Sequence, residues 1–207
     1  SLLISTISVD SDEGVKLSEE QLNVECIIRN ECIEIGNSTD SFLLKNVGQI
    51  QPDLIKYYHP ENNIWFTDNG AWFIARYDND KNDVSTPIKE VLHHKLRDAT
   101  YSSPIGISEN ISQYHYIKGN NPEKMMAQVP LYEEIFYKDV YTHIDLNYYF
   151  INDYLKYDII INPGGNVNDI QFSYFGAVSL EIGYNNNLII NTQFGQIQDS
   201  HLFIYQD

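Results

Sequence analysis

Apolar and polar residues alternate along most of this chain, and the clearest example lies between Tyr137 and Gly165. A turn at Asn152-Asp153 sorts the flanking residues into an apolar face and a mostly polar face. The apolar cross-strand pairs are Ile144–Ile161, Leu146–Ile159, Tyr148–Tyr157 and Phe150–Leu155. The other face receives Asp145 with Ile160, Asn147 with Asp158, and Tyr149 with Lys156. A slip of one residue would exchange the faces, so the pattern predicts an antiparallel hairpin with one face on a core.

A second hairpin is predicted from "NIWFTDNGAWFIARY", because Asn69-Gly70 is a strong type I′ turn signal. This turn pairs Phe66 with Phe73 and Ile64 with Ala75. The opposite face carries Trp65, Trp72 and Ile74. Both faces are apolar, so the hairpin is either covered on both sides or exposes an aromatic patch.

A third hairpin, in "AVSLEIGYNNNLIINTQFG", has "GYNNN" as its turn. Hairpins in series predict an all-β, antiparallel, sandwich-like domain with at most one or two short helices. The stretch from Thr86 to Asp98 fits both a helix and a strand. "SSPIGISENISQ", at 102–113, is the candidate linker or sub-domain boundary.

The amino-acid composition favours β-strands and argues against nucleic acid as a partner. The chain has 207 residues, of which 16 are Tyr, 9 are Phe and 2 are Trp, and aromatic residues favour strands. Its net charge of −16 repels phosphate backbones, so nucleic acid is not an expected partner. The sequence has no run of about 18 apolar residues, so it does not predict a transmembrane helix. The opening "SLLISTISVD" lacks Met, which suggests a processed N-terminus.

The two cysteines lie close together in "NVECIIRNECIEIG". A hairpin that turns near Arg29 would place Cys26 and Cys32 on one face, opposite each other. They are therefore a candidate disulfide if the protein is exported, and the alternative is a pair of reduced, buried thiols. A metal site would need more ligands than this segment offers.

Two strand carboxylates and several histidines are candidates for chemistry. Asp145 and Asp158 point away from the apolar face, and paired carboxylates can act as acid and base. We favour a structural role, in which each accepts hydrogen bonds or pairs with a cation. His143 shares a face with Asp145, and His93 and His94 are adjacent, but no metal-binding motif includes them, so surface or hydrogen-bonded histidines are expected.

The loop "YDNDKND" has oxygen ligands at the spacing that Ca²⁺ accepts. The candidate ligands are Asp78, Asp80, Asn82 and Asp83. The loop is not an EF-hand, because Asp83 and Lys89 stand where Gly and Glu are required. A plain polar turn is the alternative, so Ca²⁺ is a candidate ligand and no cofactor is required.

Trp65 and Trp72 are candidates for a stacking platform that binds a sugar ring, and interior packing explains them equally well. No nucleophile elbow, phosphate-binding loop or dinucleotide fingerprint occurs. We therefore expect no enzyme activity.

Several motifs resemble a known family in order and spacing. "FLLKNVGQ" is similar to F-x-x-N-K-G-Q, and "YHYIKGNNPEKM" to N-Y-x-x-G-N-D-P-x-x-W. "VPLYEEIFYKDVYTHIDLNYY" and "LKYDIIINPGGN" resemble V-P-x-Y-x-x-V-x-Y-x-x-V-Y-P-G-I-D-L-x-Y-Y and L-x-Y-D-F-x-V-x-P-G-A-D. The family is an uncharacterised secreted β-rich domain that precedes SBBP-type β-propeller repeats in surface proteins of gliding bacteria. The chain departs from these motifs at Val47, near Met125, at Thr142-His143 and at Leu202.

The resemblance implies a secreted or cell-surface module, exported by type IX secretion and followed by further domains of a longer protein. It divides the chain into an N-terminal strand and Cys-hairpin segment, 1–41, and a family-like β domain, 42–207. The family has no established catalytic residues, so none are carried over.

These observations give one function hypothesis and two alternatives. The first is a non-catalytic extracellular module for adhesion, glycan contact or assembly of a larger protein. The second is a subunit of an extracellular filament or surface layer, assembled by donation of the N-terminal β-strand. The third is a carbohydrate-active enzyme. The expected partners are other domains of the same protein, glycans or further copies of the chain.

Overall fold

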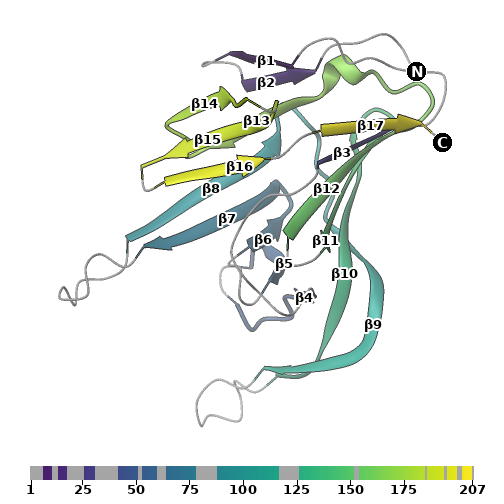
Figure 1. Ribbon diagram of the computed structural model, residues 1–207. Coiled ribbons are helices and arrows are strands. Elements are labelled where there is room, and N and C mark those ends of the chain that lie inside the picture. The colour runs from purple at the N-terminus through teal and green to yellow at the C-terminus, as the bar shows by residue number, and fades with distance from the viewer. Residues whose placement is uncertain are drawn as a thin grey trace.

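The computed structural model of the chain is all-β, as expected from the sequence (Figure 1). It describes residues 7–10, 14–17, 26–30, 42–50, 53–59, 64–77, 88–116, 126–151, 154–184, 186–193, 195–199 and 202–206. The helical turn within these residues is η2 (Val167–Asp169), in the connection that follows the first predicted hairpin.

Antiparallel strands account for most of the described residues. The strands of the N-terminal half are β1 (Ile7–Asp10), β2 (Gly14–Leu17), β3 (Cys26–Asn30), β4 (Leu43–Lys45), β5 (Ile55–His59), β6 (Ile64–Thr67), β7 (Gly70–Tyr77) and β8 (Ile88–Leu96). Those of the C-terminal half are β9 (Ile105–Tyr116), β10 (Met126–Tyr141), β11 (Ile144–Ile151), β12 (Tyr154–Ile161), β13 (Gln171–Phe175), β14 (Ser179–Ile182), β15 (Leu188–Thr192), β16 (Gly195–Asp199) and β17 (Leu202–Gln206).

Most strands belong to one large sheet that curls into a half-barrel (Figure 1). Its order is β1-β2-β13-β8-β7-β6-β5-β4-β10-β11-β12-β3-β17, and β9 pairs with β10 beside this path. The second sheet is small and has the order β14-β15-β16. Strands from the segment 1–41 belong to the large sheet, because β2 pairs with β13 and β3 pairs with β12 and β17.

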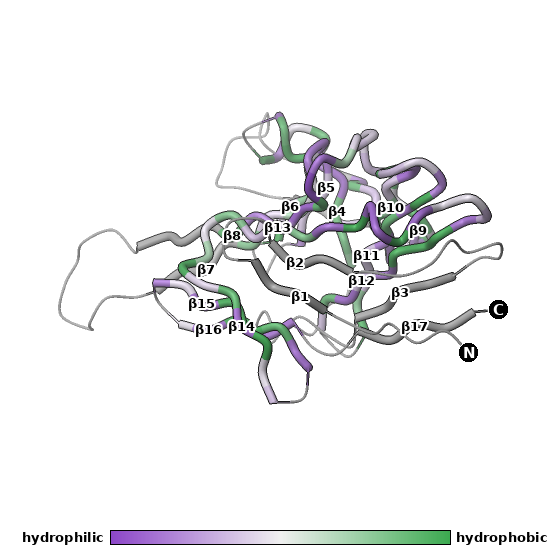
Figure 2. The backbone as a smooth tube through the Cα atoms, turned by 90° about the horizontal axis from the view of Figure 1, so that it is seen from above, coloured by the Kyte–Doolittle hydropathy of each residue, from purple (hydrophilic) through white to green (hydrophobic). Residues whose placement is uncertain are grey.

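The small sheet covers the concave face of the half-barrel, and the main core lies between the two. Ile190 of β15 belongs to the same buried cluster as residues of the large sheet, and Leu180, Leu188 and Ile197 pack against that cluster. Figure 2 shows hydrophobic and hydrophilic positions interleaved along the tube. Alternation therefore gives strands β4 to β8 and β10 to β13 one face toward this core.

The first predicted hairpin is confirmed residue by residue as β11 and β12. Ile144 pairs with Ile161, Tyr148 with Tyr157, and Phe150 with Leu155. The apolar face is buried except at Phe150, which is partly buried. The third predicted hairpin is confirmed as β14 and β15, where Leu180 pairs with Ile190.

The register expected for the second hairpin is wrong by two residues, although its faces are right. Phe66 pairs with Ala71 rather than Phe73, and Ile64 pairs with Phe73. The turn residues are Asp68 and Asn69, and the positive φ of +93° falls on Gly70. Thr67 fixes this turn, because its hydroxyl donates to the Gly70 carbonyl and accepts from the Asn69 N–H. Since a shift of two residues preserves side-chain direction, Trp65 and Trp72 still share a face.

The structure decides one alternative about local structure that the sequence left open, and it corrects two expectations. The stretch that fitted both a helix and a strand is strand β8, paired on both sides by β7 and β13. The candidate linker at 102–113 is largely strand β9, paired with β10. Arg29 is not at a hairpin turn, because β3 continues through it and pairs it with Asp158 and Phe203. The division of the chain into domains stays a prediction.

Candidate functional site

A row of cross-strand pairs runs over the face of the large sheet that points away from the main core. The pairs are Leu131–Leu44, Leu44–Tyr58, Tyr58–Trp65, Trp65–Trp72, Trp72–His93 and His93–Phe175. We define its aromatic part, which comprises Tyr58, Trp65, Trp72, His93 and Phe175, as the outer ladder. Neighbouring strands lie about 4.8 Å apart, so each ring follows the last at that step.

Ring stacking and hydrogen bonds hold the middle of the outer ladder. The rings of Trp72 and His93 stack, with centroids 3.9 Å apart and planes inclined by 9°. The Trp72 indole Nε1–H donates to the Thr67 hydroxyl at 3.3 Å. The His93 Nε2–H donates to the carbonyl of Asn69. Burial lowers the pKa of His93, and the hydrogen bond to Asn69 opposes that shift. The turn residues that set the hairpin register therefore also orient these rings.

Exposure varies along the outer ladder, in which Tyr58 at one end and His93 beside Trp72 are buried. Tyr58 belongs to a second buried cluster on this face, and Trp65 packs against it. The other members of this cluster are Leu44, Ile55, Val129 and Leu131. Trp65 and Trp72 are half-buried, and Phe175 at the far end is 74% exposed. The structure thus brings Trp65 and Trp72 together as direct neighbours, and it adds His93 and Phe175 to the site.

Asp145 and Asp158 are held in structural hydrogen bonds. Asp145 Oδ1 accepts the Asp139 N–H at 2.6 Å, and its Oδ2 accepts the Asn162 side-chain amide at 2.9 Å. Asp139 has a φ of 49°, so this carboxylate fixes an unusual backbone position beside the turn between β10 and β11. Asp158 accepts the Tyr149 hydroxyl at 2.9 Å. Both carboxylates are therefore occupied by scaffold donors.

The main core contains polar groups whose burial was not predicted from the sequence. His94 is completely buried, and its Nδ1 lies 3.0 Å from the Tyr148 hydroxyl in a hydrogen bond. Burial lowers the pKa of His94 to about 3. Within the described residues, the buried His94 Nε2 has no hydrogen-bond partner. The only signal in the sequence for this buried histidine is that His93 and His94 are adjacent in a strand. Side chains alternate along a strand, so one of the two rings must point to each face of the large sheet.

Asp199 of the small sheet joins the two sheets. Its Oδ2 accepts the hydroxyl of Tyr157 at 3.0 Å and the hydroxyl of Tyr174 at 2.6 Å. Burial raises the pKa of both tyrosines well above the ordinary value, and the nearby Asp199 adds to the shift. Tyr137 and Tyr148 are also fully buried, with pKa values raised by burial. The abundance of tyrosine in the sequence thus partly reflects a core whose hydroxyls are paired internally.

The remaining candidates lie wholly or partly outside the described residues. These include the calcium-loop ligands Asp78, Asp80, Asn82 and Asp83, and also Cys32. Cys26 begins strand β3, and its pairing with Cys32 stays a prediction. Among the residues that the structure describes, no group of three or more His, Cys, Asp or Glu side chains is placed to hold a metal ion. No helix in the described part of the chain is long and apolar enough to cross a membrane.

Comparisons with known proteins give one result for the family. The family model described as "Domain of unknown function (DUF7948)" matches residues 43–207. No curated protein and no solved structure matches the chain.

Proposed function

This chain belongs to the family of domains of unknown function described as DUF7948, and we propose that it is a non-catalytic, extracellular β module that contacts carbohydrate through the outer ladder. The observation that carries this proposal is the direct pairing of Trp65 with Trp72, continued by the stacking of Trp72 on His93. The ladder turns away from the main core and ends in the exposed ring of Phe175.

Aromatic rings suit carbohydrate because the C–H groups of a sugar pack against the face of a ring, and the indole presents the largest such face. The rings of the ladder with exposed surface are Trp65, Trp72 and Phe175, and they lie on different strands. Neighbouring strands are about 4.8 Å apart, so this spread fits an oligosaccharide better than a single sugar. The fixed turn at Thr67 and the Trp72–His93 stack hold the rings before a ligand arrives. Such preorganisation lowers the entropic cost of binding.

The non-catalytic part of the proposal is supported by the candidate carboxylates. Asp145 and Asp158 already accept hydrogen bonds from Asp139, Asn162 and Tyr149. A general acid or base needs a free atom directed at a substrate. The extracellular location, the export by type IX secretion and the place before SBBP-type repeats in a longer surface protein are proposed from the motif resemblance.

The test is a glycan array followed by titration of each hit, using the wild type, Trp65→Ala and Trp72→Ala. We expect the wild type to bind an oligosaccharide, and each variant to bind at least about tenfold more weakly, which corresponds to about 1.4 kcal/mol. Tyr184→Ala is the matched control, because it removes a fully exposed ring that lies outside the ladder. If the wild type binds no glycan, or if both tryptophan variants bind as well as Tyr184→Ala, the proposal is wrong.

The two alternative functions make different demands on the molecule. Strand donation requires the N-terminal strand to leave its own chain, whereas β1 pairs with β2 in this structure. A filament would appear as a polymer in native material, and deletion of residues 1–9 would abolish it. A carbohydrate-active enzyme would show hydrolysis that Asp145→Asn removes.

A further inference from the structure

Strand β14 lies at one edge of the small sheet. It pairs with β15 on one side, and no strand of the described residues pairs with its other side. Strand β1 of the large sheet lies near β14 without pairing with it. The Gly183 N–H donates to the Asn187 carbonyl, and Glu181 lies opposite Ile189 in the same register. Hydrogen-bonding direction alternates along a strand, so the N–H and C=O groups of Leu180 and Ile182 point to the other edge. At the start of the strand, the Val178 N–H also turns inward to the Asn191 carbonyl.

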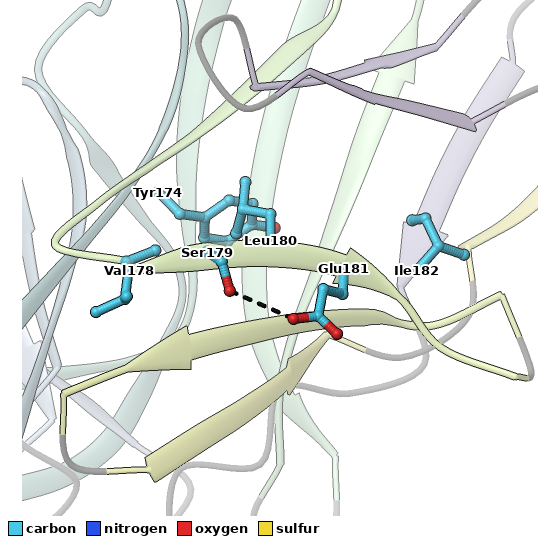
Figure 3. Close-up of a pocket in the computed structure, with 7 residues that line it drawn as sticks. Tyr174, Val178, Ser179, Leu180, Glu181 and Ile182 are labelled. Atoms are coloured by element: carbon cyan, nitrogen blue, oxygen red, sulfur yellow. Dashed lines mark hydrogen bonds between the residues drawn. The ribbon is translucent and has the colours of Figure 1, made fainter.

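A pocket of about 630 Å³ lies beside this edge (Figure 3). Tyr174 and Ala177 line it together with the residues of β14 and the preceding Val178. Val178, just before the strand, and Ile182, at its end, are 65% and 39% exposed and offer apolar surface to the pocket. The pocket therefore combines apolar side chains with backbone groups of β14 that can hydrogen-bond to an added strand.

The negative charge of Glu181 and of the whole chain favours a cationic ligand at the edge of β14. Glu181 is exposed, and its Oε1 accepts a hydrogen bond from the Asn191 side-chain amide at 2.8 Å. The same oxygen accepts a hydrogen bond from the Ser179 hydroxyl at 3.4 Å (Figure 3). Opposite charges in facing positions on neighbouring strands stabilise a sheet, and like charges destabilise it. The chain carries a net charge of −16, so a second copy would meet general repulsion and a cationic partner would be attracted.

We propose that the open edge of β14 binds an extended cationic peptide as an added antiparallel strand. Main-chain hydrogen bonds to Leu180 and Ile182 hold the peptide backbone. Apolar side chains of the peptide contact Val178 and Ile182, and a Lys or Arg on the other face lies opposite Glu181. Affinity then comes from the main-chain hydrogen bonds between the peptide and β14, and selectivity comes from the alternating side chains of the peptide.

This site is separate from the outer ladder. Strand β14 belongs to the small sheet, whereas the outer ladder belongs to the large sheet. Tyr174 of β13 also lines the pocket, but it is buried on the core side of the large sheet, opposite to Phe175 of the outer ladder. A failure of glycan binding would therefore leave the peptide proposal intact, and the reverse also holds.

The probe is a capped synthetic peptide of alternating Lys and Val, about seven residues long, titrated into the full chain at physiological ionic strength. We expect saturable binding with one peptide per chain. Methylation of the peptide nitrogens on the edge that meets β14 removes the donors, and we expect it to weaken binding at least about tenfold. A Glu-Val peptide of the same length should bind at least about tenfold more weakly than the Lys-Val peptide.

Two protein variants complete the test. Ile182→Pro removes an N–H that points to the open edge and keeps the hydrogen bonds to β15, so it should weaken binding at least about tenfold while the fold is retained. Ile182→Val keeps the N–H and should bind like the wild type. Glu181→Lys should reverse the preference in favour of the Glu-Val peptide.

The proposal is overturned by equal binding of the methylated and unmethylated peptides, because attraction to the acidic surface alone would then explain the affinity. It is equally overturned if Ile182→Pro binds as well as Ile182→Val, or if no peptide binds. A concentration-dependent dimer of the peptide-free chain that Ile182→Pro abolishes would assign the edge to a second copy and would also contradict it.

Discussion

Adjacent residues of β7 and β8 lead to opposite faces of the large sheet, and the two faces differ in how they are covered. Phe73 and His94 point to the concave side, where they are 3% and 0% exposed. Trp72 and His93 point to the other side, where the indole is half-buried and stacks on the imidazole. Both faces are aromatic, so residue type alone does not distinguish the core from the surface.

The small sheet accounts for this difference, because it packs on the concave face. Asp199 reaches from β16 to the hydroxyls of Tyr157 and Tyr174, and Ile190 enters the main core. The opposite face has a smaller buried cluster, which contains Leu44 and Tyr58, and Tyr58 is one end of the outer ladder. An aromatic row becomes core where a second layer covers it, and it stays available for a ligand where cover is partial.

The largest expected difference between the faces is in truncation of adjacent residues. Phe73→Ala should lower the free energy of unfolding by about 4 kcal/mol, because it leaves a cavity in the closed core. Trp72→Ala removes a larger but half-buried side chain and should cost about 2 kcal/mol. Urea denaturation of both variants measures the two values. Equal costs would mean that the outer face is packed like the core, and the comparison would fail.

The second expected effect is at the junction of the two sheets. Asp199→Ala leaves the buried hydroxyls of Tyr157 and Tyr174 without their acceptor, so we expect a loss of about 3 kcal/mol in unfolding free energy. Tyr157→Phe removes one hydroxyl with its hydrogen bond and should cost about 1 kcal/mol. Chemical denaturation at neutral pH gives both numbers. A small loss in Asp199→Ala would show that apolar packing alone holds the small sheet.

How far the sequence predicts this structure depends on whether the determining contacts are local. The β11–β12 register follows from strict alternation on both sides of one turn, and every expected pair occurs. The β6–β7 register depended on which residue of the Asp68-Asn69-Gly70 stretch takes the positive φ. Thr67 decides that through two hydrogen bonds, and turn propensities do not include its hydroxyl.

The candidate site was predictable in part for the same reason. A shared face for Trp65 and Trp72 follows from one hairpin. His93 and Phe175 join the ladder through the pairing of β7 with β8 and of β8 with β13, and β13 is distant in sequence. Asp199 is similarly distant from Tyr157 in sequence, so no pattern within a single hairpin indicates their contact.

The third expected effect is a pH dependence from the concave face. The pKa of His94 is about 3 in the folded protein, below its ordinary value near 6.5, because burial penalises the charged ring. Below that ordinary value the unfolded chain takes up a proton and the folded chain does not, so stability falls as the pH falls. The loss is about 1.4 kcal/mol per pH unit, or about 2 kcal/mol at pH 5.

The pH dependence of the unfolding free energy should distinguish His94 from His93. Unfolding free energies from pH 7 to pH 5 should show the slope in the wild type and a shallower slope in His94→Phe. His93→Phe should change the slope less, because the hydrogen bond to Asn69 opposes the effect of burial on the pKa of His93. An unchanged slope in His94→Phe would mean that the core admits the charged ring.

The smallest expected effect concerns Asp145, whose carboxylate lies on the face away from the main core. Asp145→Asn retains one oxygen, which can accept from Asp139 or Asn162, and places an amide donor against the other donor. We expect a loss of about 1 kcal/mol in unfolding free energy and unchanged glycan binding. Asp145→Ala removes both acceptors and should cost more.

If Asp145→Asn instead abolished a reproducible hydrolase activity while stability stayed within that range, the carboxylate would be catalytic and the non-catalytic proposal would be wrong.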